Sequence, residues 1–570
     1  MTSPHVFVAM ADILNLRCDA WLLPTDSSLR IEEHWMPADS RLRELAHESA
    51  SRDFRQGTTL AEAIRPWDKS KPLPVLTAVP IDGRWVSTAV AQRIEAFVAR
   101  SVEEVPLPAH RPYRLLALPF FGTDGGGAGQ HLGAALRAIL TASNELSNRY
   151  QVDIVLVLRD RAAYSLAQKL RRDENGANSW SGLDAKLQEK AKELGLEARS
   201  GHVVPFLGAG VSVSAGAPTW KDLLQKLKDG VELDEQGDKA FEGLPVLDQA
   251  GILSQLYCEQ NGSPEAFGMA VCEAVKLEKY GLAPALLATL PSSGAITLNY
   301  DQLFEMACRD AQRPRTVLPE DVPAVGNNWL LKLHGSVSRP ESIVLTRDDY
   351  LGYNTNRDAL SALVKAHLLT HHLLFVGFGL ADDHFHEIVH DVRRALPAKS
   401  TNDRGMGTVL SLFHEPMQNL VWKGKLDIIS MTATEFPSGD EGAKRTAAAI
   451  AGRELEVFLD MMAAYATESH SYLLSPLYYR GMTEAEADLR GQLLALASSE
   501  RSADTAEVWG VIDEAMRRLG WTPDSGRAHP DHPIHDSILS GQEETQTSAL
   551  RLLHGRPTNP QPRGPSPRSV

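Results

Sequence analysis

Cysteine is scarce in this sequence. Only four cysteines occur among 570 residues, Cys18, Cys258, Cys272 and Cys308, and no two of them have the C-x-x-C spacing. The chain therefore lacks the cysteine pairs that a disulfide framework or a cysteine zinc ribbon requires. A cysteine content this low is typical of proteins of the reducing cytoplasm.

Long apolar runs and an excess of positive charge are also missing. No run is long enough to span a bilayer. The N-terminus (MTSPHVFVAM) has no basic flank before an apolar core, so we expect no signal peptide and a cytoplasmic location. The formal net charge of −15 repels phosphate backbones and argues against nucleic acid as a partner. A dinucleotide can still bind where backbone N–H groups converge.

The chain is 43% hydrophobic and 23% charged, which at this length predicts a globular protein of two or three domains. Residues 1–172 alternate apolar runs with helical patterns, as in an α/β domain. A polar linker and a charged helix fill residues 173–198, and the largest domain is expected at 199–465. Residues 466–525 read as a small helical region. Residues 526–570 are rich in proline, glycine and serine, and we expect a disordered tail because they cannot bury a core.

The largest predicted domain alternates apolar segments with helical patterns. The segments read HVVPFLGAG, AITLNY, WLLKLHG, HLLFVGFG and GTVLSLF. Strands separated by helices predict a Rossmann-type, doubly wound parallel sheet. Helices expected between residues 220 and 290 would form an insertion in this α/β fold.

A glycine-containing turn follows the first of these segments directly. Gly208 and Gly210 stand where a strand meets a helix, and there backbone N–H groups can approach a pyrophosphate. Val213 occupies the position of the third glycine in the G-x-G-x-x-G pattern. A simple tight turn therefore explains this segment equally well when it is taken alone.

Four segments together resemble the sirtuin family. They are GAGVSVSAGAPTWK (208–221), TLNYD (297–301), KLHGS (332–336) and FVGFGLAD (375–382). They follow the family's order, and each lies at the end of an expected strand. The resemblance implies an NAD+ site across the strand ends. The residues implied for dinucleotide binding are Gly208, Ala209, Gly210, Ser212, Pro218, Trp220, Thr297, Gly377, Gly379 and Asp382.

The same resemblance implies catalytic roles for Asn299, Asp301 and His334. Cleavage of the nicotinamide–ribose bond creates an oxocarbenium-like sugar, so the site must hold the carboxamide, orient the ribose and position a nucleophile. Asp301 would bind the carboxamide, Asn299 would position water or the ribose, and His334 would act as general base. Read singly, Asn299 and Asp301 can be helix caps, and His334 can be a turn histidine.

The interval after the histidine segment departs from the sirtuin deacylases. Those enzymes carry a zinc module with paired cysteines there, whereas this interval has no cysteine. The stretch IVLTRDDY instead resembles bacterial sirtuin-like domains of antiphage defence, whose members hydrolyse NAD+. The resemblance implies an NAD+ glycohydrolase that forms a homo-oligomer. Protein deacylation stays open as an alternative, as does a non-catalytic NAD+- or ADP-ribose-binding subunit that recognises a phage or partner protein.

The first region resembles a macrodomain in its opening, in LALPFFGTDGGGAG (116–129) and in VDIVLVL. The resemblance implies that an early aspartate reads adenine and a glycine loop wraps a diphosphate. PTD (24–26) replaces the asparagine-bearing loop used for hydrolysis, so we expect an ADP-ribose-like signal to bind and to gate the second domain. A degenerate α/β scaffold is the alternative. The residues implied are Asp12, Ile13, Gly122, Gly125, Gly126 and Gly127.

One competing motif points to a different class of function. HEIVH, residues 386–390, matches the H-E-x-x-H zinc pattern, in which two histidines share one helix face. It follows FVGFG, where a sirtuin-like fold requires a packing helix, and Asp382 or Asp383 would cap that helix. We therefore keep a metalloprotease as a remote alternative and expect no metal.

Overall fold

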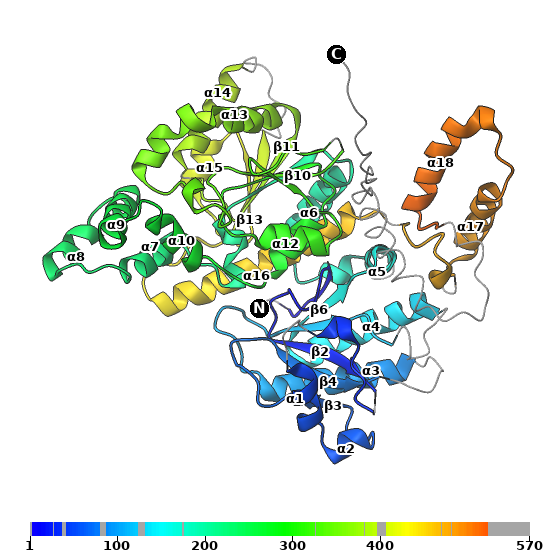
Figure 1. The fold of residues 1–570 in the computed structure, drawn as a ribbon. Helices are drawn as coiled ribbons and strands as arrows, with labels where there is room; N and C mark the ends of the chain where they lie inside the picture. Colours follow the sequence, from blue (N-terminus) through cyan, green and yellow to red (C-terminus); the bar gives the residue numbers. More distant parts are fainter. Residues whose placement is uncertain are drawn as a thin grey trace, which may run out of the picture.

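The computed structural model contains two α/β units that share a hydrophobic core (Figure 1). Each unit is built on one sheet of mainly parallel strands. The residues that the structure describes are 3–26, 28–36, 41–79, 87–122, 131–173, 176–324, 326–380, 382–395, 406–468, 470–479 and 482–522.

The N-terminal unit surrounds a six-stranded sheet. Its elements are β1 (Val6–Met10), β2 (Ala20–Thr25), α1 (Leu42–Ser49), α2 (Arg52–Arg55), β3 (Ala61–Ala63), β4 (Leu73–Ala78), α3 (Ser87–Glu104), β5 (Leu115–Pro119), α4 (Leu132–Tyr150), β6 (Asp153–Leu158) and α5 (Arg161–Asp173). The strand order is β1-β6-β5-β2-β4-β3, and only β3 pairs antiparallel, with β4. Side chains alternate between the faces of a strand. In β1, Val6 and Val8 therefore share a core with α3 and α4, whereas Phe7 and Ala9 join the core of the second unit.

The second unit surrounds a seven-stranded sheet in which every pair is parallel. Its strands are β7 (Val203–Leu207), β8 (Gly294–Thr297), β9 (Thr316–Leu318), β10 (Trp329–Lys332), β11 (His372–Val376), β12 (Gly407–Ser411) and β13 (Asp427–Ser430). The helices that pack on its faces are α6 (Ala185–Arg199), α11 (Leu282–Ala288), α12 (Leu303–Asp310), α13 (Arg347–Thr370), α14 (Asp383–Ala395), α15 (Pro416–Trp422) and α16 (Glu441–Ala466). The predicted doubly wound, parallel sheet is confirmed.

The strand order of this sheet is β13-β12-β11-β7-β8-β10-β9. The first strand, β7, therefore lies in the middle, with β8 on one side and β11 on the other. The chain changes direction across the sheet at β7, and ligands of open α/β sheets bind outside the carboxyl ends of the strands at such a switch point. The fold thus indicates the carboxyl end of β7 as the place for a site.

The helices between β7 and β8 include a module with its own small core. Leu223, Leu224, Phe241, Leu253 and Phe267 are all buried within it. Figure 1 shows this module extending from the side of the seven-stranded sheet. Its helices are α7 (Trp220–Lys228), α8 (Glu235–Glu242), α9 (Val246–Asn261) and α10 (Ala266–Ala274).

Helix α16 runs between the two units and packs along α6 (Figure 1). The two helices approach closely at Gly195, where a Cβ atom would lie 2.6 Å from the backbone oxygen of Met462. On its other side α16 meets the first unit, because Arg453 forms an ion pair of 2.7 Å with Asp153 at the start of β6. One helix therefore belongs to the cores of both units.

A second buried charge on α16 holds the same interface. Asp460 is fully buried, accepts hydrogen bonds from His5 at 2.9 Å and Trp180 at 2.8 Å, and pairs with Arg171. Burial alone would raise the pKa of Asp460, but Arg171 and His5 outweigh it and lower the pKa below its ordinary value. The carboxylate is therefore charged, and the three partners come from the residue before β1, from α5 and from the segment that follows α5.

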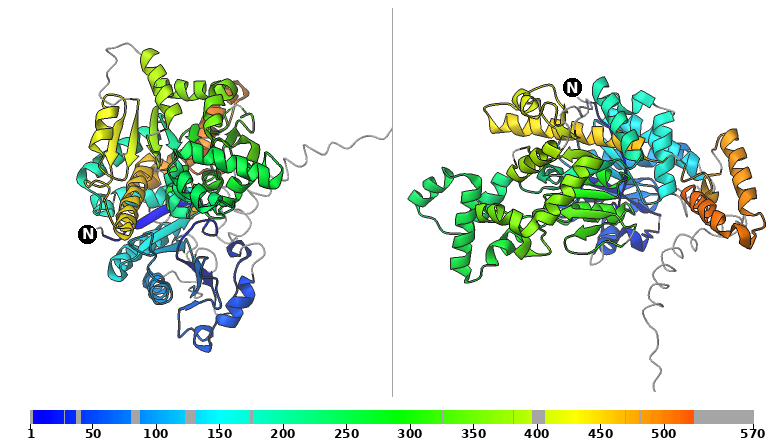
Figure 2. Two further views of the ribbon diagram at one scale, coloured as in Figure 1. Left: turned by 90° about the vertical axis from the view of Figure 1, so that its left-hand side faces the viewer. Right: turned by 90° about the horizontal axis from the view of Figure 1, so that it is seen from above.

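A pair of C-terminal helices, α17 (Glu484–Ala497) and α18 (Ala506–Arg518), projects from the body at the end opposite the α7–α10 module (Figures 1 and 2). Glu486 anchors α17, because it accepts a hydrogen bond from Tyr472 at 2.5 Å and lies 3.4 Å from Lys169. The tail expected at 526–570 lies outside the described residues. None of the described helices is apolar enough over a sufficient length to cross a lipid bilayer.

Replacing Asp460 by asparagine should destabilise the protein by about 3–5 kcal/mol, because Arg171 would be left buried without its counter-charge. Urea unfolding followed by circular dichroism measures this loss. The matched control is Asp513→Asn, which breaks a surface pair with Arg501 (2.8 Å) and should cost at most about 1 kcal/mol. Equal losses in the two variants would show that the buried network does not hold the interface.

Candidate functional site

The four segments that resemble sirtuins lie at one edge of the seven-stranded sheet. They follow β7, β8, β10 and β11, which are neighbours in the order β11-β7-β8-β10 and all run parallel. Parallel strands present their carboxyl ends at the same edge. The structure therefore brings together residues that are up to about 170 positions apart in the chain, as the sequence predicts.

The turn after β7 packs directly on the turn after β11. The N–H groups of Gly208 and Gly210 donate to the oxygens of Val376 and Gly377, both at 2.9 Å. A Cβ atom on Gly208 would lie 2.4 Å from the Gly377 oxygen, and one on Gly377 would lie 2.3 Å from the Val211 nitrogen. These glycines are required for contact between two backbones. The amides of Gly208 and Gly210 are used in that contact, whereas the sequence had assigned them to a pyrophosphate.

Space remains next to this contact. A Cβ atom on Gly379 would meet no heavy atom within 4 Å, and Ala209 is exposed. Pro218 and Trp220 lie at the start of α7, where Thr219 caps the helix, and Trp220 keeps 36% of its surface exposed. Ala209 belongs to the turn itself, and its oxygen accepts from the Ser212 N–H at 3.0 Å.

Ser212 connects the glycine turn to the predicted catalytic residues in the loop after β8. Its hydroxyl donates to Asp301 Oδ2 at 2.9 Å and accepts from Asn299 Nδ2 at 3.2 Å. Thr297 holds the same loop, because its Oγ1 accepts from the Asn299 N–H at 3.0 Å and donates to the Leu207 oxygen at 3.2 Å. Both hydroxyl side chains are buried, so they fix the orientation of the loop after β8.

Asp301 also bonds to the start of α12, although the N-cap residue of that helix is Gln302 and not Asp301. Its Oδ1 accepts from the N–H of Leu303, the first residue of α12, at 3.0 Å. Asn299 differs, because its buried Oδ1 has no hydrogen-bond partner among the described residues. A buried oxygen without a partner is costly unless water or a ligand supplies a donor. Asn299 therefore presents an acceptor that a bound molecule can use.

His334 follows β10 and is almost completely buried, at 4% exposure. Its Nε2 lies 3.9 Å from Asp382 Oδ2, and that carboxylate also accepts from the Tyr350 hydroxyl at 3.2 Å. Asp382 caps α14 as predicted, since its Oδ1 accepts from the Phe385 N–H at 2.9 Å. The sequence had assigned Asp382 to dinucleotide binding. The structure places it beside the imidazole, where a carboxylate can orient the ring.

Sequence reasoning missed Tyr350 and Lys332. Tyr350 lies edge-on to His334, with ring centroids 5.5 Å apart, and it closes the IVLTRDDY stretch. Lys332 is buried at 1% exposure beneath the loop of Asn299. Its signal in the sequence was a single charge within the apolar strand WLLKL.

The predicted regulatory residues lie at the carboxyl edge of the N-terminal sheet. Asp12 follows β1, its Oδ1 accepts from the Leu14 N–H at 2.9 Å, and its own N–H donates to the Tyr280 hydroxyl at 3.2 Å. Ile13 is buried at 3% exposure. Gly122 follows β5 with a φ of +77°. The predicted residues Gly125, Gly126 and Gly127 lie outside the described part of the chain.

The H-E-x-x-H motif lies on α14, as expected of a packing helix. His386 is already engaged, because its Nε2 lies 2.8 Å from the Leu380 oxygen and its ring packs against Trp422 at a centroid distance of 4.7 Å. Within the described ranges, no group of three or more His, Cys, Asp and Glu side chains is arranged to hold a metal ion.

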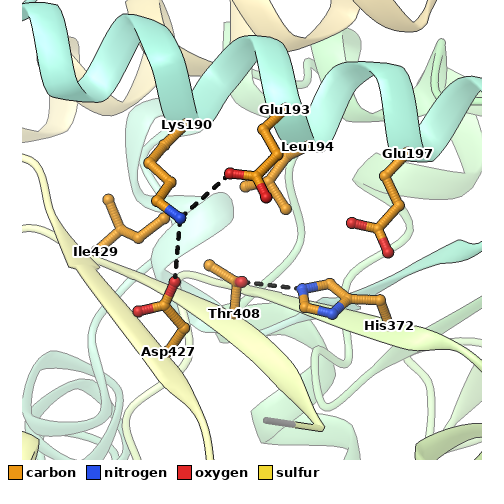
Figure 3. Close-up of a pocket in the computed structure, with 8 residues that line it drawn as sticks. All are labelled: Lys190, Glu193, Leu194, Glu197, His372, Thr408, Asp427 and Ile429. Atoms are coloured by element: carbon orange, nitrogen blue, oxygen red, sulfur yellow. Dashed lines mark hydrogen bonds and ion pairs between the residues drawn. The ribbon is translucent and has the colours of Figure 1, made fainter. Parts of the chain in front are cut away.

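A small crevice lies at the opposite edge of the same sheet (Figure 3). His372 and Asp427 begin β11 and β13, and Lys190 reaches down from α6. Its polar groups pair with one another, as in the 2.9 Å contact between His372 and Thr408. The volume of about 20 Å³ is that of roughly one water molecule. This crevice is therefore separate from the candidate site.

Replacing Gly377 by alanine should destabilise the protein by about 1–3 kcal/mol, because its φ of +64° and the approach of Val211 leave no room for a methyl group. The two turns should separate, and NAD+ binding should weaken with them. Thermal unfolding and calorimetric titration with NAD+ measure the two effects.

The matched control for this substitution is Gly379→Ala in the same turn, where a Cβ atom meets nothing. Its stability should stay within about 0.5 kcal/mol of the wild type. If the two alanine variants unfold at the same temperature, the close packing of the turns does not constrain the fold.

Comparison with known proteins identifies part of the chain. Residues 293–423 match the family described as SIR2-like domain, a range that contains Asn299, His334 and Gly377 but not the Gly208 turn. Over 220 residues the chain is 31% identical to Defense-associated sirtuin 2 of Bacillus subtilis, covering 37% of this chain and 21% of that protein.

Two further relatives carry the name NAD(+) hydrolase ThsA. The protein of Enterococcus faecium is 29% identical over 209 residues, which cover 34% of this chain and 41% of that protein. The protein of Bacillus cereus (strain MSX-D12) is 28% identical over 212 residues, which cover 36% of this chain and 42% of that protein. The chain thus spans less than half the length of these relatives. The range that matches the SIR2-like family, residues 293–423, contains most of the candidate site.

Proposed function

We propose that the chain is an NAD+ glycohydrolase that releases nicotinamide and ADP-ribose. The observation that carries this proposal is the juxtaposition of Asn299, Asp301 and His334 at the carboxyl edge of the sheet, with the buried Asn299 Oδ1 unpaired among the residues that the structure describes. Relatives named NAD(+) hydrolase ThsA support the choice of substrate. The relative named Defense-associated sirtuin 2 supports a role as an antiphage effector.

The reaction breaks the bond between the nicotinamide nitrogen and ribose C1, and the electron pair leaves with nicotinamide. Water forms the new bond to C1 and gives up one proton. Asn299 Oδ1 accepts a hydrogen bond from that water or from a ribose hydroxyl, and His334 takes the proton as general base. Asp301 binds the carboxamide N–H, because a carboxylate has lone pairs left after bonding Ser212 and Leu303. NAD+ itself contacts the turn residues Gly377 and Gly379 and the first turn of α7.

Water is the acceptor in this proposal because nothing in the sequence supplies the paired cysteines of a deacylase zinc module. The chain has no cysteine after Cys308. Deacylation of an acyl-lysine peptide and simple NAD+ binding without turnover are the two other outcomes that an assay can reveal.

Replacement of Asn299 or His334 by alanine should slow nicotinamide release by about 100-fold or more, because each removes a group that acts on the reacting atoms. The assay measures the release of nicotinamide and the deacylation of an acyl-lysine peptide together. Circular dichroism checks that each variant is folded. His390→Ala on the exposed side of α14 is the matched histidine control and should leave the rate unchanged. Wild-type rates in folded Asn299→Ala and His334→Ala would refute the proposal, and a selective loss in His390→Ala would favour metal chemistry.

We also propose that the N-terminal unit regulates this site. The proposed signal is an ADP-ribose-like nucleotide bound near Asp12 and the glycine loop of a macrodomain-like unit, in a homo-oligomer or with a partner protein. The contacts of residues 12–17 support the idea. Arg17 Nη1 donates to the Ala215 oxygen at 2.7 Å, and the N–H of Ala215 donates in turn to the Ser212 oxygen at 3.0 Å. The segment that would bind the signal therefore touches the turn that orients Asn299.

Replacing Arg17 by methionine should uncouple the signal from the site. The variant should bind ADP-ribose with wild-type affinity by calorimetry, since the Arg17 guanidinium bonds to the Ala215 oxygen. Its rate of NAD+ cleavage should no longer respond to ADP-ribose, whereas the wild-type rate should change. An unchanged response in Arg17→Met, or the absence of any response in the wild type, would count against regulation by this contact.

A further inference from the structure

Lys332 is a buried cation that the reaction described above does not use. It is the last residue of β10 and is 1% exposed. Its ammonium group donates to the backbone oxygens of Tyr300 at 3.2 Å and Asp301 at 2.5 Å, and to Glu305 Oε1 at 2.7 Å. An ammonium group has three N–H donors, so all of them are used.

Glu305 is the counter-charge and lies on α12, itself almost fully buried. Burial raises the pKa of Glu305, and the nearby Lys332 opposes that shift. A buried ion pair of this kind contributes little to stability compared with a well-packed apolar pair of the same volume. Stability alone therefore does not explain why a lysine stands in the apolar strand WLLK. The contacts of its ammonium group with the backbone of residues 300–301 offer another explanation.

Those contacts determine the orientation of the loop that carries Asn299 and Asp301. The carbonyl groups of Tyr300 and Asp301 point toward Lys332, while the side chains of Asn299 and Asp301 meet Ser212 on the other side. Tyr300 is held further by the Val337 N–H, which donates to its oxygen at 2.9 Å. The loop therefore has donors on both sides, and Lys332 supplies two of the bonds beneath it.

Lys332 ends β10, and His334 follows it two residues later. The same side chain therefore joins the end of β10, next to His334, to the loop that carries Asn299 and Asp301. Loss of the ammonium group would remove the donor that Lys332 supplies to the Asp301 oxygen and leave the Tyr300 oxygen with the Val337 N–H alone. The loop would then shift so that the Asp301 oxygen finds another donor. A shift of about 1 Å in a reacting group is enough to lower a rate by about 100-fold.

We propose that Lys332 is a positioning residue that sets the distance between Asn299 and His334 through the backbone of residues 300–301, with Glu305 as its anchor. This inference rests on the proposed NAD+ cleavage for its kinetic consequence. Lys332 acts on the geometry of the reacting groups rather than on the binding of the dinucleotide. The turnover number therefore depends on it more than the Michaelis constant does.

The test uses the full chain with Lys332→Met and with the double variant Lys332→Met/Glu305→Met. The double variant removes both charges at similar volume, so it restores an apolar core while the backbone contacts stay lost. The matched control is Arg111→Met/Glu456→Met, which removes another buried pair (2.6 Å) at the interface of the two units. Thermal unfolding, nicotinamide release and hydrogen–deuterium exchange of residues 298–303 are measured for each.

We expect the Lys332→Met/Glu305→Met variant to unfold near the wild-type temperature, with kcat lowered about 100-fold and KM within about threefold. Exchange of residues 298–303 should be faster than in the wild type, and the control should show neither change. Wild-type kcat in the double variant would overturn the inference, as would an equal loss in Arg111→Met/Glu456→Met.

The two proposals fail in different ways. If the wild type does not cleave NAD+, the proposed function is wrong, and the exchange of residues 298–303 still decides whether Lys332 holds the loop. If hydrogen–deuterium exchange of these residues is unchanged in both Lys332 variants, Lys332 does not hold the loop. If the wild type cleaves NAD+ and the variants cleave it equally fast, the function stands and the positioning role falls.

Discussion

The approach of two backbone turns at the middle of the seven-stranded sheet is the constraint on which the site depends. The turn after β7 and the turn after β11 meet at Gly208, Gly210 and Gly377, where no side chain fits between the chains. Because β7 is the strand at which the chain changes direction across the sheet, this contact fixes the backbone at the switch point. The amides used in the contact hold the two turns together, so the positions of Ser212 and Gly379 follow from it.

Ser212 links the turn after β7 to the loop after the neighbouring strand, β8. A serine hydroxyl both donates and accepts, and here it joins the Asn299 amide to the Asp301 carboxylate. On the far side of the loop, Lys332 bonds to the backbone. Asn299 is thus held by polar contacts on two sides, while no group in the described part of the chain pairs with its Oδ1. A site with one open acceptor among satisfied neighbours is organised before its ligand arrives, which reduces the ordering that catalysis would otherwise require.

Much of this arrangement follows from the sequence, and the reasons for the rest are physical. Alternation of apolar segments with helices was enough to predict the parallel sheet and the shared edge of Asn299, His334 and Gly377. The partners of a side chain across the sheet are not encoded in local spacing, so the neighbours of Asp382 and the role of Lys332 were missed. Periodicity also places charged residues of a helix toward solvent. It therefore gave no sign that Asp460 of α16 is buried between the units.

The burial of Asp460 and Asp153 explains how two sheets with separate strands behave as one body. Apolar surfaces tolerate sliding, whereas a buried carboxylate accepts only the geometry in which its donors are all present. Asp153 and Asp460 face Arg453 and Arg171 across the interface, with the two members of each pair on different units. This joint fixes β1 relative to the second sheet, and residues 12–17 continue directly from β1 to the Ala215 turn. The carboxyl end of β1 is therefore joined to the turn of Ser212 by the contacts of Arg17 and Ala215.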